Sequence, residues 1–546
     1  MVELVHAPGI DPGAGIDAGH RIKPLARLSG GADLRNRGSK RRYWATRPAS
    51  RTAERGMPMD EMPGIDAERD RLMTMLTAQQ QAFRARRAPL SHAERITALS
   101  SLQQVLFERR YDFVDALDRD FGGRSTEETL LLEIFVLIDE IRHTRRHLKR
   151  WMKPHSVMPN WQFLPSTTRF IYQPLGVVGV MGAWNYQLLL TLSPLIGAIS
   201  AGNHVMVRPS EVAPASSELM REVIDHCFPS EYVTVVTGGL ETSQAFSTLP
   251  FDHLIFTGSS RVGRIIMRNA AEHLTPVTLE LGGKSPALIG EHYDVASAAR
   301  KIVHGKFQNA GQTCVAPDYV LVAESQREAF IAAASEACAR FYPKLVDNPA
   351  YTRIISPRHY QRLEAIVREV EQGGGKVHRV NPADEDCSEA TRVFPPTLVS
   401  DCPPDSVALT EEIFGPILPV VTYKSLDQAL DYINERPKPL ALYYFSNNRA
   451  LHRKVLYGTI SGGVTVNGCI YHLPQNNLPF GGVGESGMGA YHGIDGFETF
   501  SKKKAIFFQS RFSLTRYMRP PYGRLMGLLL GFLLRNRPAI ERRPRD

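Results

Sequence analysis

Five short segments between residues 176 and 282 are apolar at nearly every position, with stretches of helical length between them. They read "GVVGVMGAW" (176–184), "NHVMVRPS" (203–210), "EYVTVVTG" (231–238), "DHLIFTGS" (252–259) and "TPVTLELG" (275–282). Strands that are apolar throughout must be covered on both faces, which is typical of parallel sheets flanked by helices. We therefore predict an α/β fold built on a doubly wound parallel sheet, with a ligand crevice at the carboxyl ends of its strands.

A second series of strand and helix patterns follows residue 314, including "DYVLVAE", "ILPVVTYKS" and "LALYYFSN". This series predicts a second α/β domain. Between residues 65 and 152 the apolar residues recur at spacings of three and four, which predicts helices packed on a larger body.

Charge is distributed unevenly along the 546 residues. The net charge is +9, yet residues 1–56 and 513–546 each carry +6 and residues 57–512 carry −3. A mildly acidic body argues against a nucleic-acid groove and favours an enzyme with basic ends. Residues 1–56 show neither helical nor strand periodicity, so we predict a disordered basic extension. A mitochondrial presequence and a start at Met57 or Met59 stay open as alternatives.

Six cysteines are scattered through the chain without C-x-x-C spacing: Cys227, Cys314, Cys338, Cys387, Cys402 and Cys469. Neither a metal site nor a disulfide framework is indicated. A reducing compartment fits this usage best, and the first residues lack the apolar core of a secretory signal. We therefore expect a cytoplasmic protein.

Several polar residues follow the predicted strands, where they would face the crevice. Gly258, Ser259 and Gly263 in "FTGSSRVG" stand at a strand-to-helix turn that suits a pyrophosphate, although an ordinary tight turn reads the same way. Glu280 ends an apolar strand, so it is either paired structurally or held as a base. Asn185 either donates to an oxyanion or caps a turn.

Cys314 lies in "FQNAGQTCVAP" (307–317) and has two interpretations. A single cysteine is more often a small core residue than a nucleophile. A thiolate needs dipolar or positive charge nearby, and the sequence alone does not show where that charge would come from.

A set of motifs resembles the aldehyde dehydrogenase superfamily, in order, from about residue 70 to 510. The motifs are "GAWNYQ", "VRPSE", "FTGSSRVG", "LELGGKSP", "FQNAGQTC", "EEIFGPILPV", "VTVNG" and "LPFGGVGESGMGAYHG". The entry "RFIYQPLGVVGVMGAWNYQ", the "GMGAYHG" ending and the apolar tail are most similar to the class 3 branch, which includes fatty-aldehyde and bacterial coniferyl-aldehyde enzymes.

The resemblance implies a mechanism. Cys314 would attack the aldehyde carbonyl, Asn185 and the Cys314 N–H would hold the oxyanion, and Glu280 would activate the water that hydrolyses the thioester. The product would be the acid of a hydrophobic aldehyde, aromatic or long-chain aliphatic. A coenzyme A-acylating enzyme and an inactive binding protein are the rival interpretations.

For the cofactor, the resemblance implies NAD, with NADP as the alternative. Gly258, Ser259 and Gly263 would contact its pyrophosphate, Glu412 would bind the nicotinamide ribose, and Phe414 would pack beside the ring. Family members usually have Lys at the position of Arg208. Arg208 favours a 2′-phosphate, whereas Glu211 favours a free 2′-hydroxyl.

The resemblance also suggests an organisation for the whole chain. We expect an NAD(P)-binding domain over 57–285 with a bridging strand near 160–175, a catalytic domain over 286–485, and a small oligomerisation element over 486–512 that forms a homodimer. The tail, 513–546, contains the apolar run 525–534, flanked by Arg516, Arg519, Arg524, Arg535 and Arg537. As a helix the run is too short to span a bilayer, so it would lie on a membrane surface, cover the substrate mouth, or pack on the enzyme.

Overall fold

The computed structural model describes residues 63–512, 515 and 518–534. The predicted extension over 1–56 and three tail arginines (Arg516, Arg535 and Arg537) lie outside the described residues. Residues from Met62 onward form a compact unit of their own, and the description below concerns this unit.

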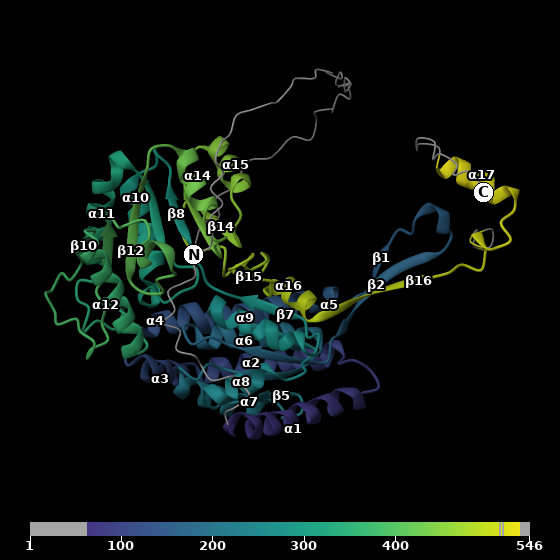
Figure 1. Ribbon diagram of the computed structural model, residues 1–546. Helices are drawn as coiled ribbons and strands as arrows, with labels where there is room; N and C mark the ends of the chain where they lie inside the picture. Colours follow the sequence, from purple (N-terminus) through teal and green to yellow (C-terminus); the bar gives the residue numbers. More distant parts are fainter. Residues whose placement is uncertain (1–62, 513–514, 516–517, 535–546) are drawn as a thin grey trace, which may run out of the picture. The chain divides into compact units, whose positions relative to one another are not determined.

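The first of the large sheets has six strands in the order β15-β7-β6-β3-β4-β5 (Figure 1). Its strands are β3 (Val177–Met181), β4 (His204–Arg208), β5 (Val233–Val235), β6 (His253–Thr257), β7 (Val277–Glu280) and β15 (Gly487–Met488). Five strands are parallel, and only β15 runs antiparallel to its neighbour β7. Chain order reverses beside β3, which confirms the predicted doubly wound sheet and puts its switch point there.

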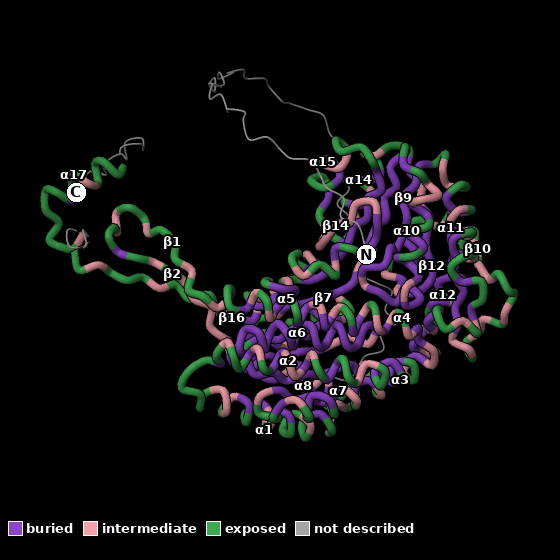
Figure 2. The backbone as a smooth tube through the Cα atoms, turned by 180° about the vertical axis from the view of Figure 1, so that it is seen from behind, coloured by how far each residue is buried: buried purple, intermediate pink, exposed green. Residues whose placement is uncertain are grey.

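Helices cover both faces of this sheet, which explains why its strands are apolar throughout. Val178 and Val180 of β3 face a core shared with α2 (His92–Glu108), α3 (Arg110–Phe121), α5 (Phe135–Trp151), α6 (Gln187–Ala201) and α7 (Pro214–Cys227). Val177 and Met181 face the opposite core, shared with α1 (Pro63–Ala85), α8 (Leu240–Ser247) and α9 (Ser260–Ala271). Every residue of α6 is buried (Figure 2).

A seven-stranded sheet has the order β10-β11-β12-β9-β8-β13-β14, and all pairs except β10–β11 are parallel. Its strands are β8 (Pro286–Ile289), β9 (Tyr319–Ala323), β10 (Lys376–Arg379), β11 (Thr397–Ser400), β12 (Ile417–Tyr423), β13 (Ala441–Phe445) and β14 (Gly463–Val466). The helices of this region are α10 (Val295–Phe307), α11 (Arg327–Phe341), α12 (Pro357–Gln372), α13 (Val407–Thr410), α14 (Leu426–Asn434) and α15 (Arg449–Gly458). This region is thus a second α/β sheet with its own helices, as the second series of apolar segments predicts.

A third, antiparallel sheet joins β1 (His155–Val157), β2 (Thr167–Pro174) and β16 (Ser501–Phe508). Strand β16 pairs with β2 along its whole length, from Ser501 opposite Pro174 to Phe508 opposite Thr167. The short helix α16 (Gly493–Thr499) leads into β16, and α17 (Arg524–Leu533) follows it. Among the described residues, no helix combines the length and apolarity needed to cross a membrane.

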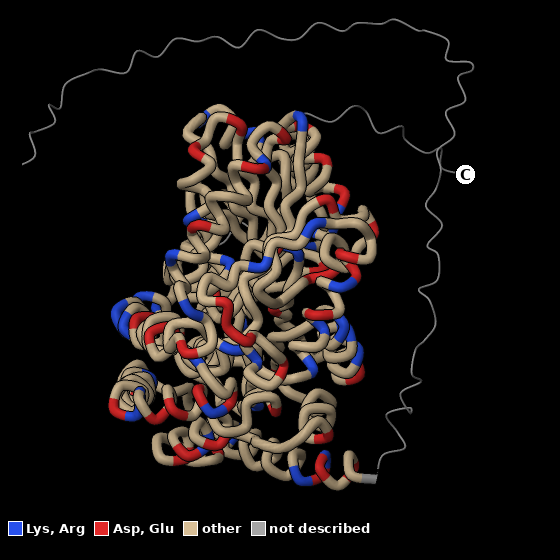
Figure 3. The backbone as a smooth tube through the Cα atoms, turned by 90° about the vertical axis from the view of Figure 1, so that its left-hand side faces the viewer, with Lys and Arg blue, Asp and Glu red and all other residues tan. Residues whose placement is uncertain are grey.

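Short helical turns complete the chain: α4 (Thr126–Thr129), the π-helical turn η2 (Leu130–Ile134), and the 3-10 turns η3 (Trp161–Phe163), η4 (Gln308–Gly311) and η5 (Glu324–Gln326). On the face seen in Figure 3, Lys and Arg are interspersed with Asp and Glu over the surface helices. That pattern agrees with the small net charge of the body.

Candidate active site

The loop that carries Cys314 has an unusual backbone. Asn309 and Ala310 have φ of 51° each and Gly311 has φ of 73°, so three successive residues are left-handed. This conformation costs a non-glycine residue about 1–2 kcal/mol. A Cβ at position 311 would lie 2.4 Å from the carbonyl oxygen of Gly415, so only glycine fits there. Packing therefore imposes this turn, and Cys314, which follows it, is a half-buried residue.

The electrostatics of the thiol are unfavourable to ionisation. Burial raises the pKa of Cys314 to about 12, and the nearby carboxyl groups of Glu412 and Glu280 add to this effect. The thiol is therefore protonated at neutral pH in this arrangement. The same interaction shows that Glu280 and Glu412 lie within electrostatic reach of Cys314.

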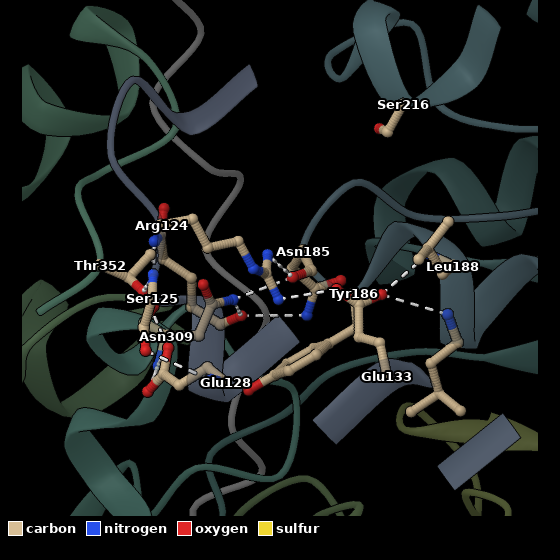
Figure 4. Close-up of polar contacts among 12 residues, drawn as sticks. Arg124, Ser125, Glu128, Glu133, Asn185, Tyr186, Leu188, Ser216, Asn309 and Thr352 are labelled. Atoms are coloured by element: carbon tan, nitrogen blue, oxygen red, sulfur yellow. Dashed lines mark hydrogen bonds and ion pairs between the residues drawn. The ribbon is translucent and has the colours of Figure 1, made fainter. Parts of the chain in front are cut away.

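Asn185 lies on the loop after β3 and contacts the thiol loop directly (Figure 4). Its side-chain Nδ2 donates to the carbonyl of Gln312 at 3.0 Å. Its own carbonyl accepts hydrogen bonds from Arg124 Nη1 and Asn309 Nδ2, both at 2.9 Å. The side chain is only 3% exposed. The loop after β3 and the thiol loop are thus joined by hydrogen bonds.

Glu280 is the last residue of β7 and is 2% exposed. Within the described part of the chain, neither of its carboxyl oxygens has a hydrogen-bond partner. Burial raises its pKa well above the ordinary value, because the charged form loses its solvent and gains no hydrogen-bond donor from the described residues. Its backbone carbonyl accepts the Gly258 N–H at 3.0 Å, which fixes the end of β7 to the turn after β6.

The turn after β6 is closely packed at the start of α9. A Cβ at Gly258 would lie 2.5 Å from the Phe256 ring, and a Cβ at Gly263 would lie 2.8 Å from Leu281. The hydroxyl of Ser259 caps α9 by accepting the Val262 N–H at 3.4 Å. The free N–H groups of this helix start form a place where an anionic group is favoured.

Arg208 and Glu211 form a separate group at the end of β4. Arg208 is 1% exposed, and its Nη2 donates to the carbonyls of Gly238 and Gly239 at 2.8 and 3.0 Å. Glu211 accepts from Arg208 at 3.4 Å and from the Ser243 hydroxyl at 3.0 Å. Its side chain is 34% exposed. The carboxylate, rather than the guanidinium, therefore faces solvent.

Glu412 and Phe414 lie in the loop before β12. Glu412 Oε1 is buried, and no partner for it exists among the residues described. Burial, with a smaller contribution from Asp318, raises the pKa of Glu412 to about 8. Phe414, with φ of 51°, packs edge-on against Trp184 with 5.4 Å between ring centres. Trp184 immediately precedes Asn185, so this loop also borders the site.

Sequence reasoning missed the polar residues behind the site. Arg124 and Glu133 are buried, Glu128 is half-buried, and the three bind the two loops just described or the helix that follows one of them. Lys306 is also buried, 3.7 Å from Asp318, and burial lowers its pKa to about 8. Lys306 comes directly before the segment 307–317 that carries Cys314, so its place in the sequence could have marked it as a residue near the thiol. Arg124 and Glu133 gave none, because a charged residue in a loop, like Arg124, or in a helical pattern, like Glu133, is usually exposed to solvent.

Asn185, Ser259 and Glu280 lie at the carboxyl ends of β3, β6 and β7 in the doubly wound sheet, and hydrogen bonds join the Asn185 loop to the loop that carries Cys314. The site combines a thiol, an amide donor and a carboxyl that has no partner among the described residues, all near a helix N-terminus. This combination is typical of a nucleotide-dependent enzyme that works through covalent thiol chemistry. Comparisons with known proteins lead to the same class.

The family model "Aldehyde dehydrogenase family" matches residues 50–506. A probable coniferyl aldehyde dehydrogenase of Pseudomonas aeruginosa is 45% identical over 457 residues, covering 84% of this chain and 95% of the relative. The substrate-bound structure of Staphylococcus aureus AldH is 36% identical with a TM-score of 0.80, over 84% of this chain and 99% of that one. A Mycobacterium tuberculosis aldehyde dehydrogenase complexed with NAD+ is 26% identical with a TM-score of 0.73, over 80% and 90% of the two chains. The chain belongs to the aldehyde dehydrogenase family, and it is an enzyme that oxidises an aldehyde to the acid.

Proposed function

We propose that the chain oxidises a coniferyl-type aromatic aldehyde to its carboxylic acid with NAD as the acceptor. The observation that carries the proposal is the set of groups around Cys314: an amide hydrogen-bonded to its loop, and a buried carboxyl with no partner among the described residues. The relative from Pseudomonas aeruginosa is named for coniferyl aldehyde. Trp184 and Phe414 add an aromatic border that suits an aromatic substrate.

The chain's residues carry the covalent steps of the proposal. The Cys314 thiol gives its proton to solvent water, its sulfur then forms a bond to the aldehyde carbon, and the resulting oxyanion accepts hydrogen bonds from the Asn185 amide and the Cys314 N–H. When bound, the nicotinamide supplies an acceptor for the hydride that leaves this carbon, which turns the adduct into a thioester. Glu280, once ionised, takes a proton from water as that water attacks the thioester, which releases the acid and the Cys314 thiolate; the proton then passes from Glu280 to the thiolate or to solvent.

Residues of this structure fit a dinucleotide. The orphaned Glu412 Oε1 offers a buried acceptor for a ribose hydroxyl, and the start of α9 at Ser259 suits a pyrophosphate. Glu211 presents an exposed carboxylate that repels a 2′-phosphate, while the Arg208 guanidinium is occupied by backbone carbonyls. These features support NAD over NADP.

The β16–β2 ribbon and α17 suggest partners. Phe507 and Phe508 on β16 are 47% and 42% exposed, and we propose that this sheet pairs with a second copy in a homodimer. On α17, Leu528 and Phe532 are 74% and 65% exposed, close to Arg524, which supports contact with an anionic membrane surface. Light scattering tests the dimer. Sedimentation with anionic liposomes, with and without residues 516–546, tests the membrane contact.

The reaction itself is tested by the growth of reduced-nicotinamide absorbance. Purified protein receives coniferyl aldehyde or a long-chain aliphatic aldehyde, with NAD or NADP, and with or without coenzyme A. We expect the highest kcat/KM with coniferyl aldehyde and NAD, and no dependence on coenzyme A. Acyl-coenzyme A as the product would assign the acylating reaction instead, and a preference for the aliphatic aldehyde would reassign the substrate.

A further inference from the structure

Arg124 and Glu133 form an ion pair that is completely buried behind the thiol loop. Arg124 Nη2 and Glu133 Oε1 are 2.8 Å apart, and both side chains are 0% exposed. Taking two charges out of water costs more free energy than a typical pair returns, so burial of such a pair is poor evidence for a role in stability. What the pair contacts is more informative.

Arg124 holds the residue that carries the oxyanion amide. Its Nη1 donates to the Asn185 carbonyl at 2.9 Å (Figure 4). Its guanidinium also lies 5.3 Å from the centre of the Tyr186 ring. The Tyr186 hydroxyl is 2.9 Å from Thr313 Oγ1, on the residue directly before Cys314. The Arg124 guanidinium thus restrains the loop that carries Asn185. It also packs against the Tyr186 ring, whose hydroxyl reaches the thiol loop.

Glu133 holds the same loop from its other side. Its Oε2 accepts the N–H groups of Leu188 and Leu189 at 2.8 and 3.2 Å, in the first turn of α6. The carboxylate therefore accepts hydrogen bonds from N–H groups that the start of a helix leaves unpaired. Its negative charge is also stabilised by the positive end of the helix dipole. Because α6 begins two residues after Asn185, the asparagine is fixed by Arg124 at its carbonyl and by Glu133 through the helix that follows.

One short segment of the chain carries both Glu128 and Glu133. Glu128 lies in α4, two residues before the π-helical turn η2 (130–134), and Glu133 lies within that turn. Glu128 accepts the Asn309 N–H at 2.9 Å, at the start of the thiol loop. One short segment therefore binds both loops of the site.

We propose that Arg124 and Glu133 are positioning residues for the reaction, which hold the Asn185 amide at the place where the oxyanion forms. This inference rests on the proposed function, since Asn185 acts on the oxyanion only in that mechanism. Neither residue touches the substrate. Their effect passes through Asn185, and the test is built on that dependence.

The test is a double-mutant cycle with Asn185→Ala. Arg124→Met combined with Glu133→Gln removes both charges and keeps an acceptor for the α6 N–H groups, so no lone charge is left buried. The rate of the first turnover is measured by rapid mixing and divided by the number of NAD-binding sites from calorimetry. We expect a fall of about 10- to 100-fold, since small misplacements of a catalytic group cost this much. In the Asn185→Ala background the same double change should cost less than about threefold.

Arg95→Met is the matched control. Arg95 is 4% exposed and donates to the Ser200 carbonyl at 2.8 Å, at the opposite end of α6. This variant should lower the melting temperature but leave the first-turnover rate per site unchanged. Equal losses for the Arg95 variant, or full additivity with Asn185→Ala, would overturn the positioning role. If Asn185→Ala alone keeps the wild-type rate, the proposed function of Asn185 fails first, and the two failures are distinguishable.

Discussion

The Glu412 carboxylate occupies the space that a side chain on Gly282 would need. A Cβ built at position 282 would lie 2.1 Å from Glu412 Oε2. Gly282 follows Glu280 by two residues. The chain just after β7, the strand that ends in Glu280, therefore leaves space for the Glu412 side chain. The glycine pair after β7 is therefore part of the site.

Gly282→Ala should displace Glu412 and weaken the contact proposed for the nicotinamide ribose. We expect kcat/KM for NAD to fall about 10-fold or more, because the methyl group cannot be accommodated without moving the carboxylate. Steady-state kinetics measure the change. Gly64→Ala is the control, because no atom lies within 4 Å of a Cβ there. An additive loss on top of Glu412→Ala would show that Gly282 does not act through Glu412.

Alkylation of Cys314 should be slow at neutral pH and should increase with pH without a plateau. The pKa of the thiol is raised to about 12, so the thiolate fraction grows tenfold for each pH unit below that value. Iodoacetamide labelling of Cys314 between pH 6 and 10, followed by peptide mass spectrometry, measures it. Glu412→Gln should accelerate labelling mainly above about pH 8, where it removes the negative charge of the ionised Glu412 carboxylate. A plateau near pH 7 would mean that other groups stabilise the thiolate.

Glu280→Gln should separate hydride transfer from thioester hydrolysis. The amide cannot take a proton from water, so a burst of reduced cofactor approaching one per site should precede slow turnover. Stopped-flow absorbance measures the burst. A slow first turnover without a burst would assign Glu280 a different role.

The same substitution should stabilise the fold. Burial raises the folded-state pKa of Glu280 above its unfolded value. The folded state therefore binds the proton more tightly, and stability falls as pH rises above the unfolded pKa. Glu280→Gln removes this loss, so its melting temperature should exceed that of the wild type by a margin that widens from pH 5 to pH 8. An equal margin at both pH values would contradict the pKa direction.

Glu211→Gln should increase the ratio of kcat/KM with NADP to that with NAD. The exposed carboxylate repels a 2′-phosphate, and the amide does not. Arg208→Lys should lower the melting temperature and leave the ratio nearly constant, because the guanidinium is used by the Gly238 and Gly239 carbonyls. A ratio that shifts toward NAD in the Arg208 variant would mean that the guanidinium reaches the cofactor after all.

The five parallel strands of the first sheet could be predicted from sequence because burial on both faces makes them largely apolar, whereas the two-residue edge strand β15 was not predicted. Strand β8 (Pro286–Ile289) escaped prediction, since four residues opening with proline carry little pattern, and β10 (Lys376–Arg379) is partly exposed and polar. The groups around Cys314 could be assigned only through family motifs. Arg124 and Glu133 could not be found at all, because their burial depends on tertiary contacts with α6.

Strands β15 and β16 are synthesised late and pair with β7 and β2, which are synthesised early. These pairings therefore limit when the fold can be completed during synthesis. Strand β7 ends in Glu280, yet its partner Gly487 is made some two hundred residues later. The edge of the first sheet thus stays open on the ribosome while the whole second sheet emerges. Glu280 can gain this neighbour only after residue 487 has been made, so a stalled chain that ends before residue 487 should hold Cys314 without a correctly seated Glu280.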